Sequence, residues 1–429
     1  MKRITIAFVA MLSTAPALGG QVRPVPPRDS AARADSIARA DSLALVKELE
    51  ALQRGDSDTT STTASTGAQG VVNARLLPDI SVVGDFIGDF SPDGSTQEDG
   101  SRLGVREVEV AFQAAVDPYF RGDVFIGFND VEGVGVEQAF LTTSSLPFGL
   151  ELKLGRFLMP VGKQNTTHRH DLHAVDYPYI NKRFLGEEGL KGTGFALSKI
   201  FAPLGFYQEL QLTAVERFGE AEEDLVVSEP INAQLDGLTY SARLRNYWDV
   251  SQSTNVEVAG FAITGKHEQP FEEAPIDGIN AIPARRTVTG LDFTFRWRPL
   301  AQGLYKSFML QAEFMSRRDS RAGRILDVPP NAPAAVSFAG GSDRGAYVFA
   351  RYQLTRRGFL GARYDQLQDP EFGGSTTKAA SAYLEFFPSE FSKLMAAYER
   401  FMPPAGNEKI NRILLQATFA LGPHKPHPF

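Results

Sequence analysis

Apolar and polar side chains alternate along most of this chain. Around residue 290, for example, the apolar side chains of Leu291, Phe293 and Phe295 are separated by Asp292 and Thr294. Successive side chains of a β-strand point to opposite faces, so this stretch presents one apolar and one polar face. Stretches of about ten residues with this pattern recur, and that is the length of a strand that crosses a membrane at a tilt. The sequence therefore predicts membrane-spanning strands.

The alternation continues through about sixteen such stretches, an even number that is typical of bacterial outer-membrane barrels. A closed barrel also pairs every backbone polar group of its strands within the lipid. We therefore expect an all-β protein, a transmembrane antiparallel β-barrel of about 16 strands. The expected strands cover residues 77–90, 103–116, 119–129, 133–143, 149–157, 190–200, 205–217, 236–248, 254–265, 286–298, 305–317, 344–354, 358–366, 378–387, 391–401 and 410–421.

The links between the expected strands alternate between short and long. Residues 144–148 and 201–204 form short links, for example, whereas residues 159–189 form a long one. Outer-membrane barrels have short turns at the periplasmic end and longer loops at the outer end. The alternation therefore orients the chain, and the long links should face outside the cell. These links are residues 159–189, 218–235, 266–285 and 318–343.

The chain before the barrel has a different character. Residues 1–20 have the pattern of a secretory signal peptide, with Lys2 and Arg3 at the start, then an apolar stretch and small residues. Residues 21–70 should form a periplasmic segment, and residues 71–429 the outer-membrane β-barrel. The expected localisation is the bacterial outer membrane.

The periplasmic segment contains the hexad-like run RDSAAR, ADSIAR, ADSLAL, which predicts a short helix over residues 29–54. Its apolar stripe includes Ile37, Leu45 and Leu49, at spacings near four. Because this stripe is too thin for the core of a monomer, the helix either joins a coiled coil or stays a loose helix. The Ser/Thr/Gly-rich residues 56–70 then provide a flexible linker.

Composition supports a barrel and excludes several other classes of protein. The chain has 31 Phe, 12 Tyr and 39 Gly, yet its mean hydropathy is only -0.18, as expected when half of each strand faces water. The absence of Cys removes disulfides, a lipoprotein anchor and thiol catalysis. A formal net charge of -7 argues against nucleic-acid binding. Since Ser and His form no nucleophile motif, we expect neither an enzyme nor a cofactor.

Two stretches around the first long link resemble the phosphate-selective porin O and P family of outer-membrane porins. They are LKLGRFLMPVGKQN at residues 152–165 and FLGEEGLKGTGFAL at residues 184–197. The resemblance implies a trimeric pore of sixteen strands whose third outer loop folds inward as a constriction. The link at residues 159–189 would be that loop.

Strand number and resemblance together suggest a function. The interior of a barrel of about sixteen strands is too wide to be filled by its own wall side chains. We therefore expect an outer-membrane porin, a water-filled channel for passive diffusion of small hydrophilic solutes or anions, which sits in outer-membrane lipid as a homotrimer. Two alternatives remain open: a plug-less barrel for metal-linked uptake, and a structural tether between outer membrane and cell wall.

The charged residues expected at the pore constriction are of both signs. They are Lys163, Arg169, Asp171, Asp176, Lys182 and Arg183. Because they form no one-sided row of basic residues, phosphate selectivity is not part of the expectation.

Strand parity also places charged side chains in the lumen. Acidic positions come first along the chain and basic positions follow: Glu107, Glu109, Glu137, Glu209, Arg243, Arg245, Arg296, Arg298, Arg351 and Arg363. In a closed barrel the two groups would occupy opposite walls. We hypothesise a transverse field that orients dipolar solutes and weakly favours anions. The alternative is an ordinary lumen of mixed charge.

The link at residues 159–189 also holds three closely spaced histidines, in the run HRHDLH. They are His168, His170 and His173. Imidazoles this close in sequence can bind zinc, so we consider them a candidate metal site. The alternative is that they only hydrate a polar pore loop.

Overall fold

The computed structural model describes residues 78–97, 99–129, 133–219, 225–227, 231, 234–270, 278–326 and 334–422. The signal peptide, periplasmic helix and linker expected in residues 1–70 lie outside the described residues. Among the residues that are described, no helix is long and apolar enough to cross a membrane.

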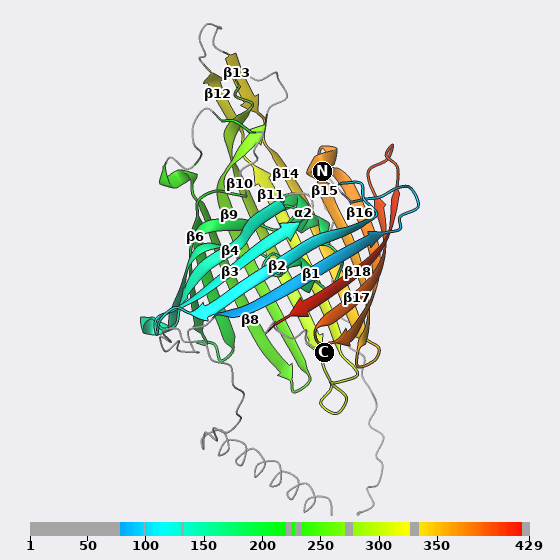
Figure 1. The fold of residues 1–429 in the computed structure, drawn as a ribbon. Coiled ribbons are helices and arrows are strands. Elements are labelled where there is room, and N and C mark those ends of the chain that lie inside the picture. Colours follow the sequence, from blue (N-terminus) through cyan, green and yellow to red (C-terminus); the bar gives the residue numbers. More distant parts are fainter. Residues whose placement is uncertain are drawn as a thin grey trace, which may run out of the picture. The chain divides into compact units, whose positions relative to one another are not determined.

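Sixteen antiparallel strands form one closed barrel (Figure 1). The barrel closes where β1 pairs with β18, from Val82 opposite Leu421 to Asp89 opposite Leu414. The predicted fold, an all-β barrel of about 16 strands, is therefore confirmed. Its strands are β1 (Asp79–Asp89), β2 (Leu103–Ala115), β3 (Phe120–Asn129), β4 (Gly133–Thr143), β5 (Leu150–Leu158), β6 (Lys191–Phe201), β7 (Tyr207–Val215), β8 (Thr239–Ser251), β9 (Thr254–Pro270), β10 (Ala281–Trp297), β11 (Phe308–Asp319), β14 (Gly341–Gln353), β15 (Gly358–Asp369), β16 (Ser375–Ser389), β17 (Ser392–Met402) and β18 (Ile410–Leu421).

The strands alternate between an apolar outer face and a mostly polar inner face. On β15, Leu360 and Tyr364 are exposed on the outside, whereas Arg363 and Asp365 between and beyond them are buried inside. This is the arrangement that lipid outside and water inside require of each strand. The outer face carries further exposed large apolar residues, among them Leu141, Leu154, Phe195, Leu212, Leu244, Leu291, Phe314, Val348, Leu384, Leu394, Leu415 and Phe419.

The structure extends the predicted strands at the end of the barrel that carries the long links, which we name the loop end. There β9 and β10 continue as a paired hairpin up to Pro270 opposite Ala281. Within the link at residues 318–343, β12 (Ala322–Leu326) and β13 (Ala334–Phe338) form a separate two-stranded sheet. Figure 1 shows this hairpin beyond the rim of the barrel. Such strands lie outside the lipid, so they lack the apolar alternation that predicts the other strands.

Two β-bulges lie in the wall formed by the first strands. On β2, Asp85 is opposite Glu107 and Phe86 is opposite Val105, so Arg106 is an extra residue. On β4, Glu137 is the extra residue of a second bulge. A bulge re-aims the side chains around it. The direction of the charged side chains at the two bulges therefore cannot be read from strict alternation along the strand.

Residues 159–190, which we name the inner loop, connect β5 to β6 and fold into the barrel. They contain the short helices η3 (Arg169–Asp171) and α2 (Tyr179–Phe184). Figure 1 shows α2 inside the ring of strands, and Ile180 and Phe184 are almost completely buried.

Apolar side chains of the inner loop pack against apolar side chains of the wall. Met159, Val161 and Ile180 belong to the same buried cluster as wall residues of β9 to β18, among them Ile263, Val288, Met315, Tyr347, Phe349, Leu367, Met395 and Leu414. The inner loop therefore occupies this side of the barrel and narrows its lumen.

Candidate functional site

The inner loop is attached to walls on several sides of the barrel by polar contacts. Lys163 Nζ donates to Glu257 Oε1 on β9 at 2.7 Å. The backbone N–H of Tyr179 donates to Asp365 Oδ1 on β15 at 3.0 Å, and its hydroxyl donates to Glu399 Oε1 on β17 at 2.7 Å. The inward fold that the resemblance implied for this loop is therefore present.

Asp176 of the inner loop pairs with two arginines of the barrel wall. Its oxygens lie 3.4 Å from Arg106 Nη1 on β2 and 3.1 Å from Arg412 Nη2 on β18. Its carbonyl accepts a hydrogen bond of 2.7 Å from Arg363 on β15. Burial alone would raise the pKa of Asp176, but the positive charges of Lys182, Arg412 and Arg106 outweigh burial and hold it well below its ordinary value. The carboxylate is therefore ionised at neutral pH.

Lys393 of β17 fixes another part of the inner loop. Its Nζ donates to the carbonyl oxygen of His170 at 2.5 Å and to that of Leu172 at 3.0 Å. The side chain is 1% exposed, which is rare for a lysine that does not serve a specific contact. Two carbonyls of η3 and the residue after it are thus held by one ammonium group.

The other charged residues predicted for the constriction have nearby partners. Arg169 Nη1 lies 3.8 Å from Glu188, and Lys182 Nζ lies 2.6 Å from Glu187. Arg183 Nη1 lies 2.7 Å from both Glu187 and Glu371, the latter in η5 (Pro370–Phe372). Asp171 Oδ2 lies 3.8 Å from His170 Nε2. The six residues therefore share one loop, but Lys163 faces β9, away from the others.

Two polar cavities lie beside residues 168–171, between the inner loop and the wall. One has a volume of about 510 Å³ and lies toward the end with the short links; it is lined by residues such as Gln113, Lys153 and Ser198. The other also measures about 510 Å³, lies toward the loop end, and is lined by Asp99, Lys182 and Glu187 among others. We name them the turn-end cavity and the loop-end cavity.

The segment at residues 168–171 borders both cavities. His168 and His170 line the turn-end cavity, whereas Arg169 lines the loop-end cavity. Residues 168–171 therefore have one cavity on the side of the short links and the other on the side of the long links.

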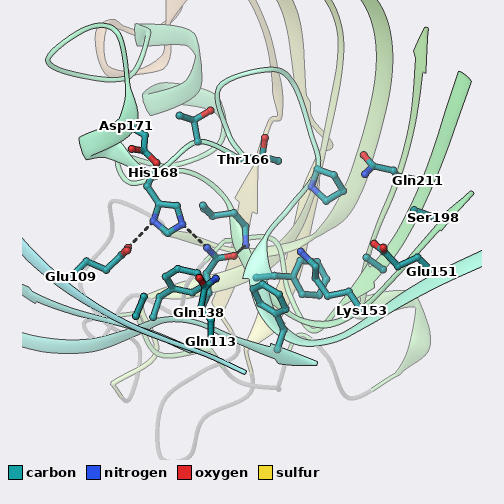
Figure 2. A pocket seen from close by; sticks show the side chains of 18 of the residues that line it. Glu109, Gln113, Gln138, Glu151, Lys153, Thr166, His168, Asp171, Ser198 and Gln211 are labelled. Atoms are coloured by element: carbon teal, nitrogen blue, oxygen red, sulfur yellow. Dashed lines mark hydrogen bonds and ion pairs between the residues drawn. The ribbon is translucent and has the colours of Figure 1, made fainter. Parts of the chain in front are cut away.

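The structure separates the three histidines of the proposed metal site. His168 Nδ1 lies 2.7 Å from Glu109 Oε2 on β2, and its Nε2 lies 2.8 Å from the Gln138 amide on β4 (Figure 2). His173, in contrast, lies 3.8 Å from Glu385 on β16. Glu109, His168 and His170 instead form a group whose potential ligand atoms all lie within 4.8 Å of one another. The set His168, His170 and His173 is therefore not the one that the fold assembles.

The surroundings of His170 are acidic. Burial alone would lower the pKa of this imidazole. The contact with Glu107 and the charges of Asp171 and Glu109 outweigh burial and raise the pKa to about 9. The site thus favours positive charge at this position.

The predicted lumen arginines are paired with acidic groups on the same part of the wall. Arg243 Nη2 lies 3.0 Å from Asp292, and Arg245 Nη2 lies 3.0 Å from Glu257, which is also 3.6 Å from Arg296.

The same holds further round the barrel. Arg351 pairs with Glu385 at 2.5 Å, and Arg363 pairs with Asp365 at 2.8 Å. The hypothesis of an acidic wall opposite a basic wall is therefore wrong, because acidic partners lie between the arginines.

The four remaining predicted lumen charges have different surroundings. Glu137 pairs with Lys191 of β6, beside Glu188. Arg298 lies one residue beyond β10, is exposed, and its Nε donates to the carbonyl of Gly303 in the following turn. It is therefore a turn residue and not part of the strand wall. Glu107 lies 3.9 Å from His170, and Glu209 lies 3.3 Å from Arg245.

Sequence reasoning missed several charged groups of the wall. Glu257, Asp365 and Lys393 occupy lumen positions that strand parity would have identified if it had been applied to every strand. Arg106 was hidden by the bulge on β2, which shifts the parity at that point. That these residues bind the inner loop could not be read from the strands, because it depends on where the loop runs inside the barrel.

Comparisons with known proteins give the fold. No protein-family model matches the chain. An uncharacterized protein of Aquifex aeolicus (strain VF5) is 28% identical over 345 residues, which cover 75% of this chain and 69% of that protein. The structure of OprB from Pseudomonas putida has a TM-score of 0.51 at 10% identity and covers 80% of this chain and 94% of its own. OmpF of Salmonella typhi has a TM-score of 0.50 at 12% identity, covering 82% and 99%.

These likenesses agree with the geometry of the barrel. The narrower resemblance to the phosphate-selective porin O and P family stays a resemblance, since no family model matches. The chain has the fold of bacterial outer-membrane porins, and this fold agrees with the expected outer-membrane localisation.

Proposed function

We propose that this protein is a porin through which small hydrophilic solutes diffuse passively across the outer membrane. The observation that carries the proposal is the pair of polar cavities on either side of residues 168–171. Each has about 510 Å³, which is enough for a small-molecule solute. On this proposal, solutes pass from one cavity to the other beside these residues, and the apolar packing of the inner loop narrows the rest of the barrel.

The paired charges of the wall support a channel with weak ion selectivity. The loop-end cavity is lined by four basic residues, Arg106, Arg169, Lys182 and Arg412, and by four acidic ones, Asp99, Asp176, Glu187 and Glu188. Balanced charge of this kind gives little discrimination between anions and cations. Separated walls of opposite charge would have created a preference for anions, and the balanced lining gives no reason to expect one. The sign of the reversal potential in a salt gradient tests this point.

The outer surface supports assembly into a homotrimer. A groove of about 860 Å³ on the outer face of β1, β17 and β18 is framed by large apolar side chains. The small outward residues Gly88, Ala396 and Ala417 lie in this groove. Small residues let a second copy approach closely within lipid, where apolar burial alone drives little association. Ala396→Trp should therefore reduce the mass of the particle in detergent to that of a monomer, whereas Leu212→Trp on the outer face of β7 should not.

Conductance tests the proposal directly. The purified, folded protein should produce stepwise ion currents in planar lipid bilayers, and liposomes that contain it should swell in small sugars. A variant in which a short Gly/Ser linker replaces residues 163–188 should give larger steps, because the inner loop no longer narrows the barrel. If the wild-type protein gives no current while the shortened variant conducts, the protein is a closed barrel and not a porin.

The same experiment separates the remaining functions. An enzyme or a cell-wall tether needs no conductance, and a barrel for metal-linked uptake would conduct poorly to ions in general.

A further inference from the structure

The border between the two cavities carries a cluster of metal-ligand side chains. Glu109 comes from β2, His168 precedes η3, and His170 lies within η3. The imidazole rings of the two histidines have centroids 5.4 Å apart. One ligand atom from each of the three residues lies within 4.8 Å of the other two. The cluster joins the inner loop to the barrel wall.

We propose that Glu109, His168 and His170 bind one Zn²⁺-like transition-metal dication. Imidazole nitrogens and a carboxylate oxygen are the ligands that zinc takes in proteins, at about 2.0–2.2 Å from the metal. His168 Nδ1 and Glu109 Oε2 already face each other at 2.7 Å. A small separation of these two atoms admits the metal between them. The two histidines select a transition metal over Mg²⁺ or Ca²⁺, which prefer all-oxygen ligands.

Neighbouring side chains hold the ligands in place. The Gln138 amide nitrogen lies 2.8 Å from His168 Nε2, while its oxygen accepts a hydrogen bond of 3.0 Å from the backbone of Leu158. Lys393 holds the carbonyl of His170. The contacts of Gln138 fix the orientation of the His168 ring. Coordination through Nδ1 would move the ring proton to Nε2, and the Gln138 amide would then turn so that its oxygen accepts that N–H, as partners of metal-bound histidines do. The ring of His168 is therefore positioned before any metal arrives.

The charge of the surroundings suits a dication. Glu107 lies 3.9 Å from His170 Nδ1 and adds a second carboxylate to that of Glu109. A dication that displaces the proton of His170 would meet two carboxylates with a charge of about −2, which it would balance. Asp171, 3.8 Å from His170, adds further negative charge on the cavity side.

The turn-end cavity gives the metal a way in and leaves a coordination position open. Glu109, His168 and His170 all line this cavity, and Figure 2 shows His168 between Glu109 and Gln138. Three protein ligands and one open position are typical of zinc sites that exchange a water or a solute. A bound dication would also fasten residues 168–170 to β2, on the route that the proposed function gives to solutes.

Equilibrium binding tests the site without reference to transport. The folded full-length protein in detergent should bind Zn²⁺ at micromolar concentration in isothermal titration calorimetry, and Mg²⁺ should not compete. His168→Asn, His170→Asn and Glu109→Gln should each weaken this binding at least tenfold. His173→Asn is the matched control, because His173 lies in the same loop but contacts Glu385. It should bind zinc as the wild type does.

Zinc K-edge absorption spectra add a readout that a change in folding cannot imitate. The wild type should show two imidazole ligands, and the double variant His168→Asn with His170→Asn should lose both. The heat-dependent shift in gel mobility of each variant confirms that its barrel is folded. Equal zinc affinity in the double variant and the wild type, or no binding by the wild type, would overturn the proposal. Either result leaves the conductance test of the porin unaffected.

Discussion

Lys393 is the side chain whose removal should loosen the inner loop most selectively. Lys393→Met keeps the length and apolar stem of the side chain but leaves the carbonyls of His170 and Leu172 without their donor. Each buried carbonyl that loses its partner costs about 1–3 kcal/mol. The variant should unfold at lower urea concentration, and trypsin should cleave it faster at Arg169 and Lys182. Lys378→Met, at an exposed position of β16, should change neither property.

Asp176 gives the inner loop a dependence on acid. Its pKa lies well below the ordinary value because Lys182, Arg412 and Arg106 stabilise the ionised form against burial. A depressed pKa in the folded state contributes stability above the unfolded value of about 3.9, and this contribution disappears as pH falls through the folded pKa. Asp176→Asn should therefore be less stable in urea than the wild type from pH 7 to pH 5.

The difference in unfolding free energy between wild type and Asp176→Asn should narrow below about pH 4, where the carboxyl of the unfolded chain takes up a proton while that of the folded chain is still ionised. Asp99→Asn serves as the control, since Asp99 lies in an exposed loop and accepts hydrogen bonds from Ser101, away from the wall arginines that pair with Asp176. A difference that stays constant down to pH 3 would show that the ion pairs of Asp176 do not stabilise the fold.

At the scale of elements, α2 rests against β14 at a position without a side chain. A Cβ on Gly345 would lie 2.5 Å from Ile180 Cγ2 and 2.6 Å from Leu367 Cβ, so Gly345→Val must displace the helix or the wall. Overpacking of this kind costs about 1–3 kcal/mol. We expect lower stability in urea and larger current steps. Gly341→Val, on the same strand with nothing within 4 Å, should leave both unchanged; similar behaviour of the two variants would contradict this packing.

The sequence predicted the elements that touch lipid better than those that do not. Each of the sixteen barrel strands was expected within a few residues of its observed position, because lipid on one face and a polar lumen on the other impose strict alternation. The hairpin of β12 and β13 and the extension of β9 and β10 lie beyond the lipid, so no such pattern marks them. The bulges at Arg106 and Glu137 were also missed, because an extra residue reverses the parity of the positions beyond it and one short strand offers no independent check of its register.

The candidate site depends on contacts between distant parts of the chain, which the alternation along a single strand cannot predict. Parity placed Glu109 and Arg363 in the lumen, and the spacing of HRHDLH suggested that its histidines act together. Which partners they meet depends on strand register and on the path of the inner loop. His173 contacts β16, for example, whereas His168 contacts β2, although the two are only five positions apart in sequence.

For the molecule as a whole, ion selectivity follows from how the wall charges are paired. Glu257 is 0% exposed and lies within 3.6 Å of Lys163, Arg245 and Arg296, so one carboxylate offsets several cations. The wild-type channel should show a reversal potential near zero in a salt gradient. Glu257→Gln removes the carboxylate while keeping its size, and should shift the reversal potential toward anion preference.

The exposed turn residue Glu390 is the control for this shift, because Glu390→Gln removes the same charge at a distance from the wall pairs. A strong anion preference in the wild type would mean that the ion pairs of the wall do not control which ions permeate. A shift in Glu390→Gln as large as that in Glu257→Gln would mean that net charge matters and local pairing does not. Weak wild-type selectivity with a shift only in Glu257→Gln is the result that the paired wall requires.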